Sequence, residues 1–280
     1  MRDPRVPESL EGWWILHRMF SFDRLIWDTL GEKRRTKIAA RTRDLFEHMH
    51  ASNDGDIGLV QLVGHKGELM LTHYARSYDG LAYAQMLVDK LELRALLDPL
   101  ASYVSILEVG MYDATAKIHT DLAARNLEAG SSEWNKAFDE ALASQAASPY
   151  IAPRLWAKIP SRRYACFYPM DKRRGESVNW YALSYEQRLK MMHDHGIVGR
   201  SYAGKLTQVI SGSIGYDDYE WGVDLYADDP LVFKKLVYEM RFDEASSKYG
   251  EFGAFWSGLQ FSPKHLGVFL DGESVPALDE

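Results

Sequence analysis

The sequence lacks the features that mark a secreted, disulfide-stabilised or membrane-spanning protein. Cys166 is the only cysteine in 280 residues, so the chain has no internal disulfide and no Cys-x-x-Cys pair to hold zinc or an iron–sulfur cluster. No apolar run approaches the roughly 18 residues of a membrane span, and the N-terminal MRDPRVPESLEG lacks the apolar core of a signal peptide. We therefore expect a cytoplasmic protein with no membrane span.

An excess of positive charge is also missing. Lys and Arg number 33 against 40 Asp and Glu, which gives a net charge of −7. This balance argues against nucleic acid or an anionic membrane as a partner, and it indicates a small anionic ligand that local basic groups bind. With 46% hydrophobic and 12% aromatic residues, the chain has enough apolar surface to bury a large core.

The same order of elements is predicted twice along the chain. The first half predicts a strand at 12–20, helices in 23–50, a hairpin at 57–75, a helix at 79–100 and a strand at 102–112. The second half predicts a strand at 162–170, a helix at 184–195, a strand pair at 205–228, a helix at 230–250 and a strand at 252–262.

This repeat predicts the fold class and the division of the chain. Strand, helix, strand, strand, helix, strand is the ferredoxin-like order, so we expect an α+β fold in which two ferredoxin-like repeats form a dimeric α+β barrel within one chain. The predicted parts are an N-terminal half at 1–125, a connecting arm at 126–153 that is helical at first and then Ala/Ser-rich, and a C-terminal half at 154–280.

Strand alternation brings a tyrosine and a glutamine onto apolar faces. Tyr164, Cys166 and Tyr168 share one face of their predicted strand, and Gln208 lies between Leu206 and Ile210 on another. A buried Tyr or Gln is most often a hydrogen-bonded structural group, so this placement alone assigns no function.

Among the nine histidines, His193 and His195 lie together near the end of a predicted helix. They are two residues apart, face different directions and do not form the i,i+4 pair that binds one metal ion. One of them is a candidate axial ligand for haem iron, although a single helical histidine is usually a surface or core residue.

Five cations surround the Tyr-Pro-Met of RRYACFYPMDKRRG, which is unusual in an acidic chain. The preceding loop PRLWAKIPSRR adds Arg154 and Lys158. Such a loop is commonly a solvated surface, but here it precedes the Tyr168 strand and is also a candidate to close over an anionic ligand.

Three longer stretches resemble a known family. YPMDKRR, HDHGIVGRSYAGKLTQVISGSIGYDDYEWGVDLYADD and FKKLVYEMRFDEASSKYGEFGAFWSG are similar to the coproheme decarboxylases of the chlorite dismutase superfamily. The resemblance is dense from about residue 153 to 258 and weaker, though colinear, from 11 to 112. It implies binding of Fe-coproporphyrin III (coproheme), which is both cofactor and substrate, in the C-terminal half, and hydrogen peroxide-dependent conversion of two propionates to vinyl groups, which yields haem b.

The resemblance also implies roles for individual residues. His195, directly before the Gly-x-x-Gly-Arg sequence, is the implied iron ligand. Tyr168 is the implied catalytic residue, which is oxidised to a phenoxyl radical. The remaining implied contacts to coproheme come from residues of four segments: Arg154, Lys172, Gln208 and Ser246. A homopentamer and a transient contact with coproporphyrin ferrochelatase are the implied partners.

Gln208 distinguishes between relatives in this superfamily. Chlorite dismutases resemble one another in having a distal arginine at this position, thirteen residues after the iron ligand, and glutamine lacks that positive charge. The alternatives that remain are a chlorite dismutase-like peroxidase, a non-enzymatic haem carrier or sensor, and a purely structural barrel.

Overall fold

The N-terminal half folds into four long strands with two helices against them. The computed structural model describes residues 6–278 of the chain. The elements of this half are β1 (Ser9–Phe22), α1 (Arg24–Thr29), α2 (Glu32–Ala51), β2 (Gly55–Leu62), β3 (Leu69–Ala75), α3 (Tyr78–Asp89), the 3-10 helix η1 (Glu92–Leu96) and β4 (Leu97–Gly110). Antiparallel pairing gives the strand order β4-β1-β3-β2.

The C-terminal half repeats this arrangement. Its elements are β5 (Tyr164–Lys172), α7 (Tyr185–Ser201), β6 (Leu206–Gly212), β7 (Trp221–Ala227), α8 (Leu231–Met240), α9 (Glu244–Ser247), β8 (Gly250–Phe252), β9 (Trp256–Phe261), the 3-10 helix η2 (Pro263–His265) and α10 (Leu266–Leu270). The strand order β6-β7-β5-β9 matches that of the first half, because each first strand pairs with the third and fourth strands of its repeat.

The two half-sheets close into one barrel. β4 pairs with β6 through Ile106 and Leu107, and β2 pairs with β9 over Leu59–Leu62. Of the nine strands, β8 pairs only with the end of β5, so the other eight form a closed antiparallel ring. This arrangement confirms the predicted dimeric α+β barrel.

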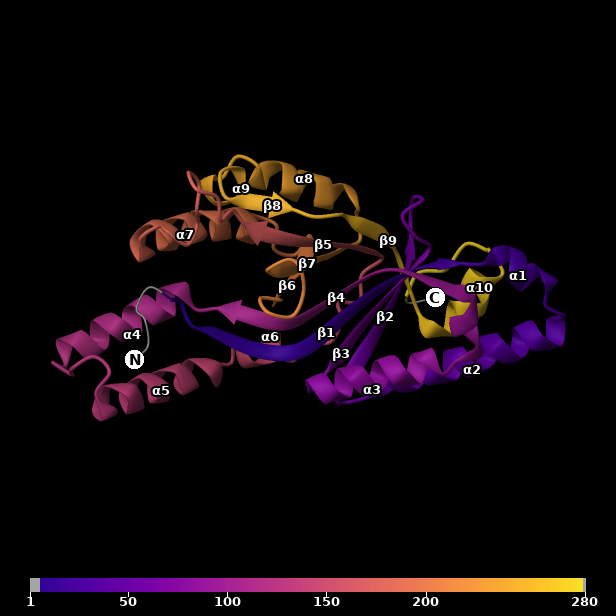
Figure 1. Cartoon of the computed structure of the whole chain (residues 1–280), viewed down its shortest axis with the longest axis horizontal. Helices are drawn as coiled ribbons and strands as arrows, with labels where there is room; N and C mark the ends of the chain where they lie inside the picture. Colours follow the sequence, from indigo (N-terminus) through magenta and orange to yellow (C-terminus); the bar gives the residue numbers. More distant parts are fainter. Residues whose placement is uncertain (1–5, 279–280) are drawn as a thin grey trace.

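Each half-sheet has one face toward the barrel interior and one face under its own helices. In β5, Ala165 and Phe167 pack with residues from β1, β2 and β3 across the interior, whereas Cys166 and Tyr168 pack with residues of α8. Helices α2 and α3 lie on one side of the barrel, and α7 and α8 lie on the opposite side (Figure 1).

A buried hydrogen-bonded pair crosses the barrel interior. The His17 Nε2 of β1 lies 2.9 Å from the Asp224 Oδ1 of β7, and the His17 ring stacks on Phe167 with 4.0 Å between ring centroids. Both side chains of the pair are almost fully buried. The pair therefore connects the two repeats at a place where solvent cannot replace either partner.

The connecting arm is helical in more of its length than predicted. The predicted arm at 126–153 contains α5 (Ser132–Ala146) and the start of the short α6 (Ala152–Leu155), whereas the preceding α4 (Tyr112–Ala124) lies in the predicted N-terminal half. The Ala/Ser-rich segment is helix α5, and its Trp134 and Phe138 form a small core with Ile118 and Leu122 of α4. Apolar packing between the two helices thus gives this segment a defined structure.

Three predicted helix ends were wrong. The predicted helix at 79–100 ends at Asp89, and β4 begins at Leu97, before Pro99, which cannot donate a helical hydrogen bond. Residues 230–250 form α8, α9 and the start of β8 rather than one helix, because Asp243 caps a new helix. Helix α7 continues past His195 to Ser201, and its packing against α8 and α9 compensates for the low helix propensity of its glycines.

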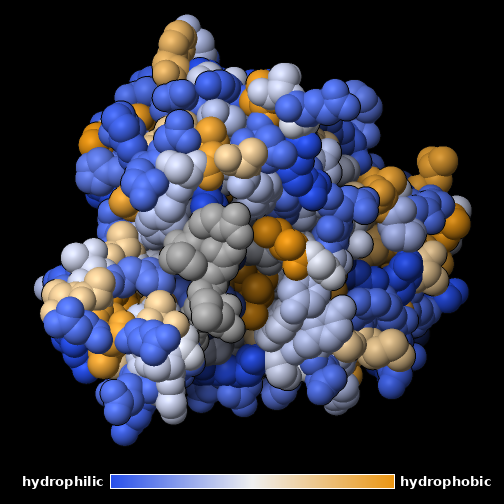
Figure 2. Space-filling view, turned by 60° about the vertical axis from the view of Figure 1, so that its left-hand side comes forward, coloured by the Kyte–Doolittle hydropathy of each residue, from blue (hydrophilic) through white to orange (hydrophobic). Residues whose placement is uncertain are grey.

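The face of the molecule seen in Figure 2 is mostly hydrophilic, as expected from the charge content. In the view of Figure 2, apolar residues appear in small separate groups among polar ones. Within residues 6–278, no helix is both long enough and apolar enough to cross a lipid bilayer.

We predict that Asp224→Ala destabilises the fold strongly. The substitution leaves His17 Nε2 buried without its hydrogen-bond partner, and leaving such a buried group unsatisfied costs about 1–3 kcal/mol. Urea denaturation measures the free energy of unfolding. Asp218→Ala, at an exposed position of the same half, should change it by less than about 0.5 kcal/mol. Equal stabilities of the two variants would contradict the importance of the cross-barrel pair.

Candidate functional site

The candidate site lies on the helix-covered face of the C-terminal half-sheet. Cys166 and Tyr168 of β5 and Val223 and Leu225 of β7 form an apolar floor with Leu236 of α8. This face differs from its N-terminal counterpart because several predicted site residues reach it from α7, β5 and β6.

His195 is fixed in position by a carboxylate. Its Nδ1 lies 3.1 Å from the Asp243 Oδ2, and no described residue forms a hydrogen bond with its Nε2. Metal-bound histidines commonly use one ring nitrogen for such an outer partner and the other for the metal. His193, by contrast, is exposed, so the geometry favours His195 as a ligand.

Asp243 belongs to a small polar cluster at the start of α9. The Ser246 hydroxyl lies 3.1 Å from the Asp243 Oδ2 and 3.4 Å from the His195 Nδ1. Burial alone would raise the pKa of the Asp243 carboxyl, but hydrogen bonds with His195 and with the Ser246 backbone N–H lower this pKa below its usual range. Asp243 is therefore ionised at neutral pH and holds the His195 ring in one orientation.

Gln208 of β6 lies opposite the helix that carries His195. A β-carbon placed on Gly199 would lie 3.8 Å from the Gln208 Oε1 and 3.8 Å from the Met240 Cε. Gly199 follows His195 by one helical turn and so shares its face of α7. The Gln208 amide therefore lies on the side of α7 toward which His195 also projects.

Tyr168 is almost completely buried in an aromatic cluster. It is 2% exposed, its ring stacks on Phe255 with centroids 4.5 Å apart, and Phe252 lies 5.7 Å away on a tilted plane. Burial raises the pKa of the Tyr168 phenol well above its usual value, Cys166 raises it further, and the Arg241 guanidinium lowers it. The hydroxyl therefore keeps its proton at neutral pH.

Lys172 lies on the same face of β5 as Tyr168, four residues further along. Its ammonium donates to the Ala245 carbonyl at 2.9 Å and lies 4.6 Å from the centre of the Trp180 ring. Burial lowers the pKa of Lys172 to about 8, although the carboxylates of Asp243 and Glu220 oppose this shift. The ammonium form still predominates at neutral pH.

Arg154 lies apart from the other predicted site residues. It is exposed on α6, which packs on β1 and β4 rather than on the strands that carry Tyr168 and Gln208. The structure thus brings His195, Ser246 and Lys172 together near α9, with Tyr168 and Gln208 on the adjoining strands. A role for Arg154 at this site remains a prediction.

Most of the neighbouring cations have structural partners. Lys158 donates to the carbonyls of Ser52 and Gly55, and the Arg162 guanidinium pairs with Asp228. Arg163 binds the carbonyls of Gln260, Val275 and Pro276. Arg173 and Arg174 pair with Glu251 and Glu220. Of the five cations around Tyr-Pro-Met, Lys172 alone is buried beside the site.

Sequence reasoning missed two residues of this region. Asp243 carried a local signal, since an Asp three residues before Ser246 is typical of a helix N-cap, but nothing in the sequence connects it with His195, 48 residues earlier. Arg241 stacks on Phe252 at 4.6 Å and lies near Tyr168. The position of Arg241 depends on how α8 packs against the sheet, and the periodicity of the sequence does not predict this packing.

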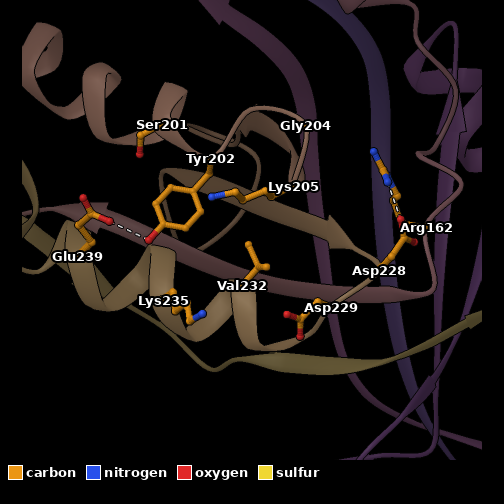
Figure 3. A pocket seen from close by; sticks show the side chains of 10 residues that line it. All are labelled: Arg162, Ser201, Tyr202, Gly204, Lys205, Asp228, Asp229, Val232, Lys235 and Glu239. Atoms are coloured by element: carbon orange, nitrogen blue, oxygen red, sulfur yellow. Dashed lines mark hydrogen bonds and ion pairs between the residues drawn. The ribbon is translucent and has the colours of Figure 1, made fainter.

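A separate open pocket of about 640 Å³ lies where α7 ends and α8 begins (Figure 3). Within the described chain its lining includes none of the six predicted site residues. The Tyr202 hydroxyl donates to Glu239 at 2.7 Å across this pocket and connects α7 with α8. The carboxylates and Arg162 are engaged with protein partners, so the pocket itself offers no catalytic arrangement.

The donor set fits an iron porphyrin. His195 offers a free ring nitrogen whose opposite nitrogen is anchored, which is the arrangement of an axial iron ligand. The surrounding floor is apolar, and the Lys172 ammonium lies at its edge, where carboxylate substituents need donors.

Comparison with known proteins supplies independent evidence. A family model described as Chlorite dismutase matches residues 35–261. A coproheme decarboxylase of Staphylococcus saprophyticus is 40% identical over 261 residues, covering 91% of this chain and 94% of that protein. A Haloquadratum walsbyi protein named for heme binding is 38% identical over 98% of this chain, which spans only 49% of that relative.

Solved structures are similar over nearly the whole length. A heme-binding protein from Thermus thermophilus shares 34% identity with a TM-score of 0.81, covering 97% of this chain and 100% of that one. A chlorite dismutase from Candidatus Nitrospira defluvii, with a TM-score of 0.68 and 18% identity over 94% of this chain and 95% of that one, shares the fold. By the family match and the identity to its relatives, the chain belongs to the chlorite dismutase family.

Proposed function

We propose that this protein is a hydrogen peroxide-dependent coproheme decarboxylase that converts two propionates of Fe-coproporphyrin III to vinyl groups and so produces haem b. The observation that carries the proposal is His195, on the helix that packs over the half-sheet face with the buried Tyr168. Its Nδ1 is held by Asp243, and no described residue forms a hydrogen bond with its Nε2. Coproheme decarboxylases at about 40% identity over most of the chain support it.

The stoichiometry of the proposed decarboxylation determines which groups the protein must provide. Each round oxidises one –CH2–CH2–COOH group by two electrons, breaks the bond to the carboxyl carbon, and gives –CH=CH2 and carbon dioxide, while one hydrogen peroxide becomes two waters. The bound iron supplies oxidising power from peroxide. The protein provides ligation, orientation and a group that removes hydrogen from the propionate.

Tyr168 is the proposed hydrogen-removing group. Because burial raises the pKa of its phenol, it loses an electron and a proton together when it is oxidised. The resulting phenoxyl takes a hydrogen atom from the propionate β-carbon and becomes a phenol again. Loss of a second electron, of the carboxyl proton and of carbon dioxide then leaves the vinyl group. The two electrons and two protons released in one round, one of each from Tyr168 and one of each in this last step, account for the conversion of one hydrogen peroxide to two waters.

Polar groups at the edge of the site are the proposed carboxylate donors. Lys172 uses one of its three ammonium hydrogens for the Ala245 carbonyl and has two left for a propionate. Arg154 and Ser246 are the further proposed contacts to propionates. The single hydroxyl hydrogen of Ser246 is donated to Asp243 in this structure, so Ser246 would donate to a propionate only after this hydroxyl turns away from Asp243. The neutral Gln208 amide offers a weak polar contact to peroxide. The proposed setting, a cytoplasmic homopentamer with transient contact to coproporphyrin ferrochelatase, follows from the family resemblance.

We predict that His195→Ala removes the proximal ligand but retains the carboxylate donors. Coproheme should still bind, about tenfold or more weakly, as is typical of disturbed metal sites, and its Soret band should shift. Absorption titration with coproheme measures both effects. His193→Ala should behave like the unmodified protein, because His193 is exposed. A shifted band in His193→Ala with an unchanged band in His195→Ala would refute the ligand assignment.

We predict that Tyr168→Phe abolishes decarboxylation while preserving the fold. The change removes one hydroxyl and keeps the ring volume, so coproheme should bind with little change. A phenylalanine ring cannot form the phenoxyl, so peroxide should be consumed without formation of the three-propionate intermediate or haem b. Mass spectrometry of the porphyrin after peroxide addition measures this.

The control for that prediction is Tyr164→Phe on the same face of β5. Tyr164 lies four residues before Tyr168 and is packed against the same apolar cluster. This variant should turn over at nearly the unmodified rate. Haem b formation by Tyr168→Phe at a comparable rate would make Tyr168 an ordinary structural tyrosine.

A further inference from the structure

The Tyr168 ring is covered on one side by a single aromatic side chain. Phe255 stacks on it with centroids 4.5 Å apart and planes inclined by 26°. Phe252 touches the ring at 5.7 Å on a more tilted plane and is itself covered by the Arg241 guanidinium. Phe255, in the loop between β8 and β9, is only partly buried, whereas Tyr168 is 2% exposed.

Phe255 also lines a solvent-open apolar pocket. It has a volume of about 310 Å³, and its lining includes Cys166, Phe255 and Tyr238. Cys166 and Phe255 both neighbour Tyr168, but Tyr168 itself does not line the pocket. Phe255 therefore contacts both the phenol ring and a space that small solutes in the solvent can occupy.

The loop that carries Phe255 is anchored on both sides. The Gly253 N–H donates to the Pro169 carbonyl at 2.8 Å, and a β-carbon on Gly253 would lie 2.7 Å from the Pro169 Cγ, so only glycine fits there. Lys66, from the β2–β3 turn of the other repeat, donates its ammonium to the Phe255 carbonyl at 3.0 Å. These contacts hold the ring in place over Tyr168.

We infer that Phe255 is a positioning residue that shields Tyr168 from small solutes in the pocket. This inference rests on the proposed role of Tyr168. A phenoxyl in an open site would accept an electron and a proton from a small reductant such as ascorbate and return to phenol without reacting with a propionate. With Phe255 in place, the oxidised ring reacts with the propionate and not with small solutes.

A first experiment tests the shielding without porphyrin or peroxide. Tetranitromethane nitrates phenolate rings, and peptide mass spectrometry measures nitration at Tyr168. In Phe255→Ala, water reaches the Tyr168 phenol and lowers its pKa. Each decrease of the pKa by one unit raises the fraction of phenolate about tenfold. We expect about tenfold or faster nitration than in the unmodified protein, and a smaller increase in Lys66→Met, which removes only the loop anchor.

Two variants separate shielding from general loosening. Phe255→Leu keeps an apolar side chain over the Tyr168 ring and should retain most of the protection. Tyr238→Ala changes the lining of the same pocket at a residue that is 60% exposed, and it should leave nitration of Tyr168 unchanged. Equal nitration of Tyr168 in Phe255→Ala and the unmodified protein, or equal increases in Phe255→Ala and Tyr238→Ala, would overturn the inference.

A second experiment measures the consequence during turnover. With coproheme, peroxide and ascorbate, Phe255→Ala should form several-fold less haem b per peroxide consumed than without ascorbate, and the unmodified protein should be nearly insensitive. Equal sensitivity to ascorbate would overturn the inference. If the unmodified protein forms no haem b at all while nitration responds as expected, the proposed function fails and the shielding stands.

Discussion

Closure of the eight-stranded ring is the constraint on which the rest of the structure depends. Because β2 pairs with β9 and β4 with β6, neither half-sheet has a free long edge, and each has one face committed to the barrel interior. Helices can then cover only the outer faces. The alternation of β5 therefore sends Phe167 inward and Tyr168 outward, into the layer between sheet and helices.

The two repeats use this outer layer differently. In the N-terminal half, Ile38 and Phe46 of α2 pack directly on Leu59 and Leu71, so the layer is a filled apolar core. In the C-terminal half, α7 occupies the corresponding place in the repeat and carries His195. The same architecture thus gives a filled apolar layer in one repeat and, in the other, a layer with the proposed iron ligand His195, the Tyr168 phenol and the Gln208 amide.

The electrostatics of the site follow from burial. Asp243 is stabilised as an anion by hydrogen bonds with His195 and Ser246, while burial lowers the pKa of Lys172 to about 8 and raises that of Tyr168. One small region therefore contains the Asp243 carboxylate, which orients the His195 ring, the Lys172 ammonium, which has further hydrogens to donate, and the protonated Tyr168 phenol. This combination suits a substrate that is a metalloporphyrin with several carboxylates.

The sequence predicted the fold well because the repeat order and strand alternation are local patterns that the closed barrel preserves. It correctly indicated that Tyr168 faces an apolar layer, which two-residue periodicity determines. It did not reveal Asp243 beside His195, because that contact depends on how α9 packs against α7. It also overestimated the free cations near Tyr168, since ion pairs such as Arg162–Asp228 form between distant segments.

The most direct test of the central claim is the product balance with coproheme. Purified protein is incubated with Fe-coproporphyrin III and titrated with hydrogen peroxide, while evolved carbon dioxide and porphyrin mass are measured. The account predicts two carbon dioxide molecules and one haem b for each coproheme, with a three-propionate intermediate after the first. Bound coproheme that loses no carbon dioxide would contradict it in favour of a haem carrier, and rapid oxygen release from chlorite would contradict it in favour of a chlorite dismutase.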